Sequence, residues 1–315
     1  VNPYQTDGQI AQTIYNWGGG TTARGFRSDF PATRDVGWEK TTSLNAGLDF
    51  GLFRDRIHGT VDVYRNNTTD LLMERSVPAV LGYDRIRANI GATRNEGIDI
   101  TLSSVNISRP VSRFSWSTEV SFSANKEQII DLYGDEQDDV GNRWFIGHPI
   151  NVFYDYEKQG IWQVADSLEI ERFNANGHAY EPGDIRVVDQ NGDYRIDDED
   201  FTILGSTVPK WTAGLTNSIK YRGFDLSFFI FFRYGQGIFN RQLCPMLAGR
   251  YQDRNVDYWT YDNPTNEYPR PDRFRDFPLH QRSLYFTETS FIKVRHITLG
   301  YDLPERWISS IGMRN

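Results

Sequence analysis

Two amphipathic segments joined by a three-residue turn, residues 211–220 and 224–234, constrain the fold of this chain most strongly. In both, apolar and polar side chains alternate, and an alternation of period two places them on opposite faces of a β-strand. Each segment has about ten residues, the length that a tilted strand needs to cross a bilayer, whereas strands of soluble sandwiches are nearer five or six. The hairpin therefore predicts an antiparallel sheet of membrane length.

Alternation recurs in five further segments, which gives about seven strands by period-two matching. These segments lie near 44–50, 57–64, 98–102, 114–122 and 291–301. Short links alternate with long ones along the chain: the short ones lie near 51–56, 105–112, 221–223 and 302–311, and the long ones near 65–96, 124–210 and 235–290. Outer-membrane barrels show this rhythm because their periplasmic turns are short and their extracellular loops long. We therefore expect an all-β, antiparallel transmembrane β-barrel fragment of about seven to eight strands.

The composition limits the alternatives. No apolar run approaches the roughly 18 residues of a transmembrane helix, so an α-helical membrane protein is excluded. The formal net charge of −8 argues against a nucleic-acid partner. No P-loop, HExxH motif or nucleophile elbow occurs, and the five histidines have no shared metal spacing, so we expect no enzyme.

The segment from Asp189 to Asp200 has the spacing of a calcium loop. Its candidate ligands are oxygen donors at loop positions 1, 3, 5, 7, 9 and 12: Asp189, Asn191, Asp193, the Arg195 carbonyl, Asp197 and Asp200. Two departures weaken the match, since position 6 holds Tyr194 where glycine is usual and position 12 holds the shorter Asp200. The loop is thus either a structural calcium site or an acidic, solvated turn, and no other cofactor is expected.

Aromatic side chains in the long loops are candidates for substrate binding. They are Tyr154, Trp162, Tyr258, Trp259 and Tyr261. Such rings can stack on sugars or grip a peptide, and they can equally pack the loops together or contact a partner.

A set of ordered motifs resembles the SusC/RagA type of TonB-dependent outer-membrane transporter. The matching strings are GWEKTT at 37–42, TTDLL at 68–72, NEGID at 95–99, FYDY at 153–156, GIWQ at 160–163, PGDI at 182–185, FIKVR at 291–295 and ITLGYDL at 297–303. Each is weak alone, but their order over nearly the whole chain makes the resemblance specific.

The resemblance implies that residues 1–315 are part of one β-barrel domain of about 22 strands, with the plug domain and the final strands outside them. It further implies an outer-membrane importer of oligosaccharides or peptides with long loops extracellular. The implied partners are a SusD-type surface lipoprotein, the TonB complex and the lipid bilayer. The alternative is a secreted β-rich carbohydrate-binding module with a calcium-stabilised loop, and a purely structural outer-membrane barrel is a third reading.

In the transporter reading, the turn at 221–223 faces the periplasm and one row of the second strand faces lipid. That row is Phe224, Leu226, Phe228, Ile230 and Phe232. Phe229 and Phe231 then point into a lumen that should be polar, and the sequence does not explain them.

Overall fold

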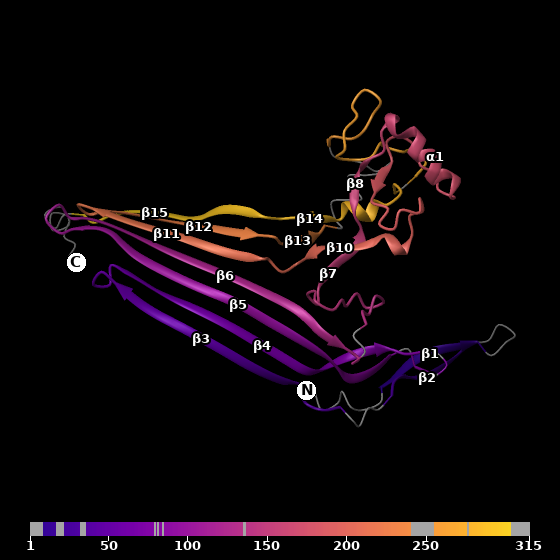
Figure 1. The fold of residues 1–315 in the computed structure, drawn as a ribbon, viewed down its shortest axis with the longest axis horizontal. Helices are drawn as coiled ribbons and strands as arrows, with labels where there is room; N and C mark the ends of the chain where they lie inside the picture. The colour runs from indigo at the N-terminus through magenta and orange to yellow at the C-terminus, as the bar shows by residue number, and fades with distance from the viewer. Residues whose placement is uncertain are drawn as a thin grey trace. The chain divides into compact units, whose positions relative to one another are not determined.

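The computed structural model describes residues 9–16, 22–31, 36–78, 80, 82–83, 85–134, 137–240, 255–275 and 277–303 (Figure 1). None of the helices among these residues is long and apolar enough to span a membrane. The chain divides into two compact units, Val1–Ser104 with Ser121–Ile150, and Val105–Val120 with Asn151–Asn315. The predicted link near 302–311 lies largely outside the described residues.

One seven-stranded sheet contains every strand that the alternation predicts. Its strand order is β15-β12-β11-β6-β5-β4-β3. The strands are β3 (Lys40–Leu52), β4 (Ile57–Ser76), β5 (Arg85–Arg109), β6 (Phe114–Leu132), β11 (Trp211–Tyr221), β12 (Phe224–Tyr234) and β15 (Phe291–Tyr301). Their neighbours pair antiparallel in β3–β4, β4–β5, β11–β12 and β12–β15. The predicted fold class is confirmed.

The long link predicted at 65–96 is wrong, because the two strands beside it continue through most of it. β4 and β5 stay paired from Ile57↔Ser104 to Ser76↔Arg85, with register shifts beside Leu71. Polar pairs such as Asn67↔Arg94 interrupt the apolar pattern here. Beyond them, Ile86, Ala88 and Ile90 alternate with polar residues in a short run that the period-two matching did not count. Likewise β6 continues to Leu132, into the long link predicted from 124.

In the first unit, a separate two-stranded hairpin precedes this sheet. It consists of β1 (Gln9–Asn16) and β2 (Thr22–Phe30), and it was not predicted. In the sheet itself, Leu48 lies opposite Val61, and Val61 lies opposite Ile100, so apolar residues of three strands share one face. On the other face the Tyr64 side chain lies over Gly97, and its hydroxyl donates a hydrogen bond to Asn125 Oδ1 at 3.1 Å.

In the second unit, the lipid-facing row predicted for β12 continues on β15. Leu226 lies opposite Leu299, Phe228 opposite Ile297, and Ile230 opposite Val294. A β-bulge opposite Phe229 and Ile230 skips Arg295 and thereby keeps the apolar residues of both halves of β15 on one face. Ile297 and Leu299 are 68% and 72% exposed in this chain, so the row forms an uncovered apolar face.

On the opposite face of β12, neighbouring side chains account for the presence of Phe231. Its ring lies 6.0 Å from that of Phe291, and the guanidinium carbon of Arg295 lies 4.7 Å from its centroid. Cation–π and aromatic contacts thus hold Phe231 among polar neighbours. Phe229 lies opposite His296.

A polar network interrupts the apolar face at β6 and β11. Asn217 Oδ1 accepts hydrogen bonds from Trp116 Nε1 and from the Thr118 hydroxyl, each at 2.8 Å. Asn106 Nδ2 donates to the Thr118 hydroxyl at 2.7 Å. Asn217 is buried, so these bonds satisfy an amide that would be costly on an apolar surface.

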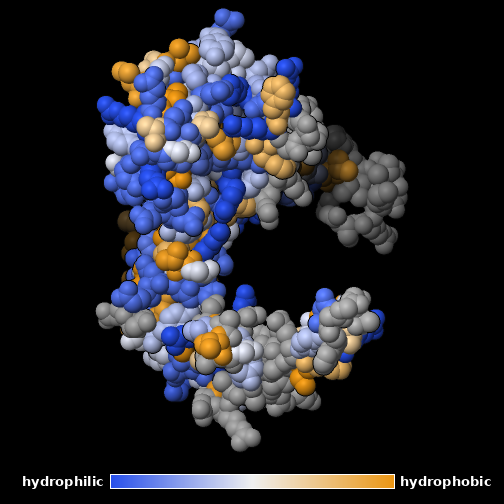
Figure 2. All heavy atoms as spheres, turned by 90° about the vertical axis from the view of Figure 1, so that its right-hand side faces the viewer, coloured by the Kyte–Doolittle hydropathy of each residue, from blue (hydrophilic) through white to orange (hydrophobic). Residues whose placement is uncertain are grey.

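The long connections of the second unit are folded rather than irregular (Figure 1). They contain β7 (Val152–Tyr156), β8 (Lys158–Ile161), η3 (Val164–Asp166), α1 (Ser167–Ala175), β9 (Ile185–Val187), η4 (Asp198–Asp200), β10 (Phe201–Ser206), β13 (Gly237–Phe239), η6 (Gln281–Leu284) and β14 (Phe286–Glu288). We call these segments the loop assembly. Its surface, in the upper part of Figure 2, is mostly hydrophilic with hydrophobic residues scattered over it.

Candidate functional site

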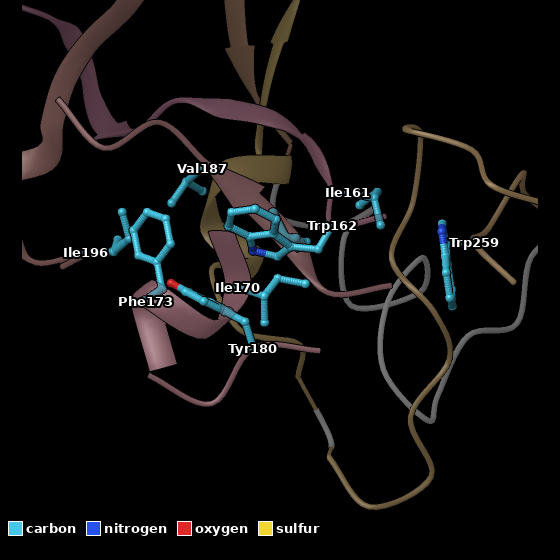
Figure 3. Close-up of a cluster of buried hydrophobic side chains, with 9 residues drawn as sticks. Ile161, Trp162, Ile170, Phe173, Tyr180, Val187, Ile196 and Trp259 are labelled. Atoms are coloured by element: carbon cyan, nitrogen blue, oxygen red, sulfur yellow. The ribbon is translucent and has the colours of Figure 1, made fainter. Parts of the chain in front are cut away.

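The loop assembly has its own hydrophobic core, centred on Trp162 (Figure 3). The Trp162 ring lies 5.6 Å from that of Phe173 on α1 and 5.8 Å from that of Tyr180. The other buried members are Ile161, Ile170, Ile185, Val187, Ile196 and Trp259. Arg186 covers the Trp162 ring at 4.3 Å and donates to Glu169 at 2.8 Å. The loops are therefore held by packing as well as by surface hydrogen bonds.

A segment distant in sequence, residues 255–270, is anchored to this core. Trp259 donates through Nε1 to Gln163 Oε1 at 2.8 Å, and the Arg270 backbone N–H donates to Gly183 O at 2.8 Å. Lys158 Nζ donates to the carbonyls of Asn266 and Glu267 at 2.8 and 2.7 Å. Two long connections therefore form one structure.

The five aromatic candidates fall into two groups. Trp162 and Trp259 are each 2% exposed and pack in the core, so in this structure their role is structural. Tyr261 is 75% exposed and its ring lies 5.0 Å from that of Trp259. Tyr258 is partly exposed, and Tyr154 packs edge-on against Phe201 on β10. Substrate contact by the three tyrosines stays a prediction.

Two histidines meet at Tyr180, although the sequence shows no relation between them. The Tyr180 hydroxyl contacts His280 Nε2, and the His178 ring stacks on Tyr180 at 5.0 Å. His178 Nε2 accepts a hydrogen bond from the Ile196 backbone N–H at 2.9 Å, which requires a neutral imidazole. Burial, with help from His178, lowers the pKa of His280 to about 4, and burial also lowers the pKa of His178.

The calcium-like loop is closed by hydrogen bonds within itself. Asp189 accepts from the N–H groups of Gly192 and Tyr194, and Asp200 accepts from those of Gln190 and Asp197. Tyr194 has a φ of +60°, the left-handed conformation that explains the usual glycine at this position. Asn191, Asp193, Arg195 and Asp197 are exposed. In the described part of the chain, no three His, Cys, Asp or Glu side chains form a group that could hold a metal. Calcium binding here stays a prediction.

An ion pair between a buried carboxylate and a half-exposed arginine joins β7 to η6. Asp155 is 3% exposed, and its carboxylate lies 2.7 Å from Arg282 Nη2 while accepting from the Tyr156 N–H at 2.9 Å. Sequence reasoning missed Asp155, Lys158, Arg186 and Arg282. Their partners lie in other segments, so no local pattern marks them.

Comparison with known proteins places this fold. A family model described as "TonB dependent receptor-like, beta-barrel" matches residues 5–315. The chain belongs to this TonB-dependent receptor family. Proteins of this family reside in outer membranes.

Individual TonB-dependent receptors are similar to this chain over its whole length. TonB-dependent receptors P26 and P3 of Formosa agariphila are 26% and 29% identical to it and match 100% of it, which is 32% of each relative. TonB-dependent receptor SusC of Bacteroides thetaiotaomicron is 27% identical over 86% of the chain and 26% of the relative. The chain thus spans about a third or less of the length of these curated relatives.

Among solved structures, the fold is similar to that of the RagAB peptide transporter. The match has a TM-score of 0.70 at 22% identity and covers 97% of this chain and 33% of that one. A RagAB importer structure in the open-open state matches with a TM-score of 0.69. The SusC/RagA-type resemblance is thus confirmed, and nothing supports the alternative of a secreted module.

Proposed function

We propose that the whole protein is a TonB-dependent nutrient importer of the outer membrane, and that residues 1–315 form part of its β-barrel domain. The family match over residues 5–315 carries this proposal. The uncovered apolar face of the sheet supports it, because transmembrane strands alternate between a lipid-facing apolar side and a polar lumen side.

In this arrangement each part of the chain has a distinct role. The row from Phe224 to Phe232 faces lipid, and the turn at 221–223 faces the periplasm. The loop assembly faces the cell exterior, where its mostly hydrophilic surface suits an aqueous environment. The chain contributes binding and gating, while bond chemistry plays no part.

The substrates we propose are oligosaccharides or peptides, captured together with a SusD-type surface lipoprotein and imported with energy from TonB. Support comes from the names of similar proteins, SusC for a curated relative and a peptide transporter for the RagAB structures. A structural calcium ion in the loop at 189–200 is compatible with this function but is not required for it.

Deletion of the gene in its native host tests the proposal. We expect loss of growth on a defined oligosaccharide or peptide mixture as sole nutrient, restored by the wild-type gene, with the product in the outer-membrane fraction. A soluble product, or unchanged growth on every oligosaccharide and peptide source tested, would contradict it.

A further inference from the structure

The loop assembly contains a half-open cavity of about 450 Å³. Its wall includes Thr202, Ile203 and Leu204 of β10, together with Phe286 and Thr287 of β14. Ligand pockets in proteins commonly measure roughly 300–1,000 Å³. The cavity therefore has room for a small ligand or for a few residues of an extended chain.

The β10 side of the cavity is an open strand edge. Thr202, Ile203 and Leu204 line the cavity, and a register shift between Ile203 and Gly205 leaves Leu204 outside the ladder with β7. β10 pairs only with β7 in its two-stranded sheet. Among the described residues, no other backbone hydrogen bond joins β10 to a third segment. Such an edge presents N–H and C=O groups that an extended peptide can pair with.

The aromatic ring beside this edge is already engaged. Phe286 lies 5.2 Å from Phe153, and a Cβ atom built on Gly205 would come within 2.8 Å of its ring. Its faces are thus occupied by protein, and it does not provide the free stacking platform that a sugar ring needs. Backbone pairing is the recognition that the wall favours.

The charges around the cavity favour a basic ligand. Glu157 and Glu267 are exposed acids in the wall, whereas the Lys158 ammonium is held by the carbonyls of Asn266 and Glu267. Two carboxylates and one engaged lysine leave the wall with net negative charge. Charge complementarity of this kind selects partners and speeds their association.

We propose that this cavity binds an extended, basic peptide segment that pairs as an added strand with β10. The binding holds whether or not the bound peptide is the transported nutrient, so it stands apart from the importer function. Backbone hydrogen bonds supply affinity, and Glu157 and Glu267 supply the preference for lysine or arginine side chains.

Two synthetic peptides test this on the whole receptor in detergent. The first is a fluorescent, capped hexapeptide of alternating lysine and valine, and the second has the same sequence with every backbone nitrogen methylated. Because this N-methylation removes the donors of both strand edges, we expect binding to weaken about tenfold or more, as read by fluorescence anisotropy.

Receptor variants test the charge preference. E157Q combined with E267Q should weaken the unmethylated peptide about fivefold or more. The matched control E171Q, an exposed glutamate on α1 outside the cavity wall, should leave binding unchanged.

Three results would overturn the proposal: no binding of the basic peptide, equal binding of the methylated peptide, or equal competition by maltohexaose. The peptide pair probes the wild-type receptor, so a variant that fails to fold leaves this test intact. Loss of nutrient uptake in cells with peptide binding retained would count against the importer function alone.

Discussion

At the scale of single residues, the buried polar groups of the loop assembly are the most informative. His178 and His280 lie in one cluster with Tyr180, and both are neutral in the folded state. A histidine whose folded pKa is below its unfolded value of about 6.5 stabilises the fold above pH 6.5. That stability is lost as the pH falls through the folded pKa.

Acidification should therefore loosen the loop assembly between pH 6.5 and about 4, the pKa of His280. We expect amide hydrogen exchange in residues 161–187, corrected for intrinsic rates, to show less protection at pH 5 than at pH 7.5. H280N should flatten this dependence, because asparagine tolerates the left-handed φ of +56° at position 280 and does not titrate. The control H148N changes an exposed histidine of the other unit and should keep the wild-type profile.

Asp200 is the residue on which the loop at 189–200 depends. It is 0% exposed and accepts from two backbone N–H groups. D200A removes the charged acceptor of both N–H groups from a buried position, and we expect a loss of about 2–4 kcal/mol from the free energy of unfolding of the loop assembly. D198A, at an exposed neighbour, should cost far less. Proteolysis of the assembly under graded denaturant measures both, and equal effects would refute the role of Asp200.

The same assembly allows the calcium prediction to be checked. If the loop holds calcium, roughly millimolar calcium should raise its melting temperature relative to EGTA, since a ligand bound only to the native state stabilises it. D197N should abolish the rise. An unchanged melting temperature would count against a structural ion.

At the scale of elements, the β11–β12 hairpin separates what local sequence encodes from what it does not. Alternation located all seven strands of the sheet and the residues that share one face of β12, because the period of two is a direct consequence of strand geometry. It did not locate the ends of β4 and β5, because polar pairs such as Asn67↔Arg94 interrupt the apolar pattern before them. The matching also stopped short of the ladder past Leu71, where the register shifts and the apolar run is short.

Neighbouring residues on β12 provide a matched test of the face assignment. F228R places a charge in the apolar row and should cost about 2–4 kcal/mol if it lies at the bilayer midplane. F229R places the same charge on the opposite face, beside His296, and should cost less. The SDS-resistant folded fraction in the outer membrane reports both, and a smaller effect at Phe228 would reverse the assignment.

At the scale of the whole molecule, the loop assembly contains a core that is separate from the apolar face of the sheet. The sequence motifs indicated the order of its segments along the chain. Its contacts, however, join residues about a hundred positions apart, such as Gln163 with Trp259. No single-sequence pattern encodes such pairs. The roles of Trp162 and Trp259 as core residues, and the meeting of His178 with His280, could therefore not be predicted.

This separation predicts two levels of stability within one chain. W162A removes the centre of the loop core and should cost the assembly about 3–5 kcal/mol. Hydrogen exchange should then accelerate in residues 158–187 while β11 and β12 keep their protection. L168A, which truncates a side chain that is 77% exposed, serves as the control. Loss of protection in both regions would show that they unfold together.

The bulge in β15 has a consequence for how this strand can change over time. Val294 and Ile297 share a face although they are three positions apart, because the bulge adds one residue between them. Removing Arg295 alone would leave Val294 and Ile297 two positions apart, so a regular strand without the bulge would still keep them on one face. A single-residue gap at Arg295 should therefore be tolerated. A gap elsewhere in β15, with the bulge kept, would turn one half of the strand over and exchange apolar side chains for polar ones such as Lys293 or His296. In this strand, the number of residues between the apolar side chains decides which face they occupy, in addition to their identities.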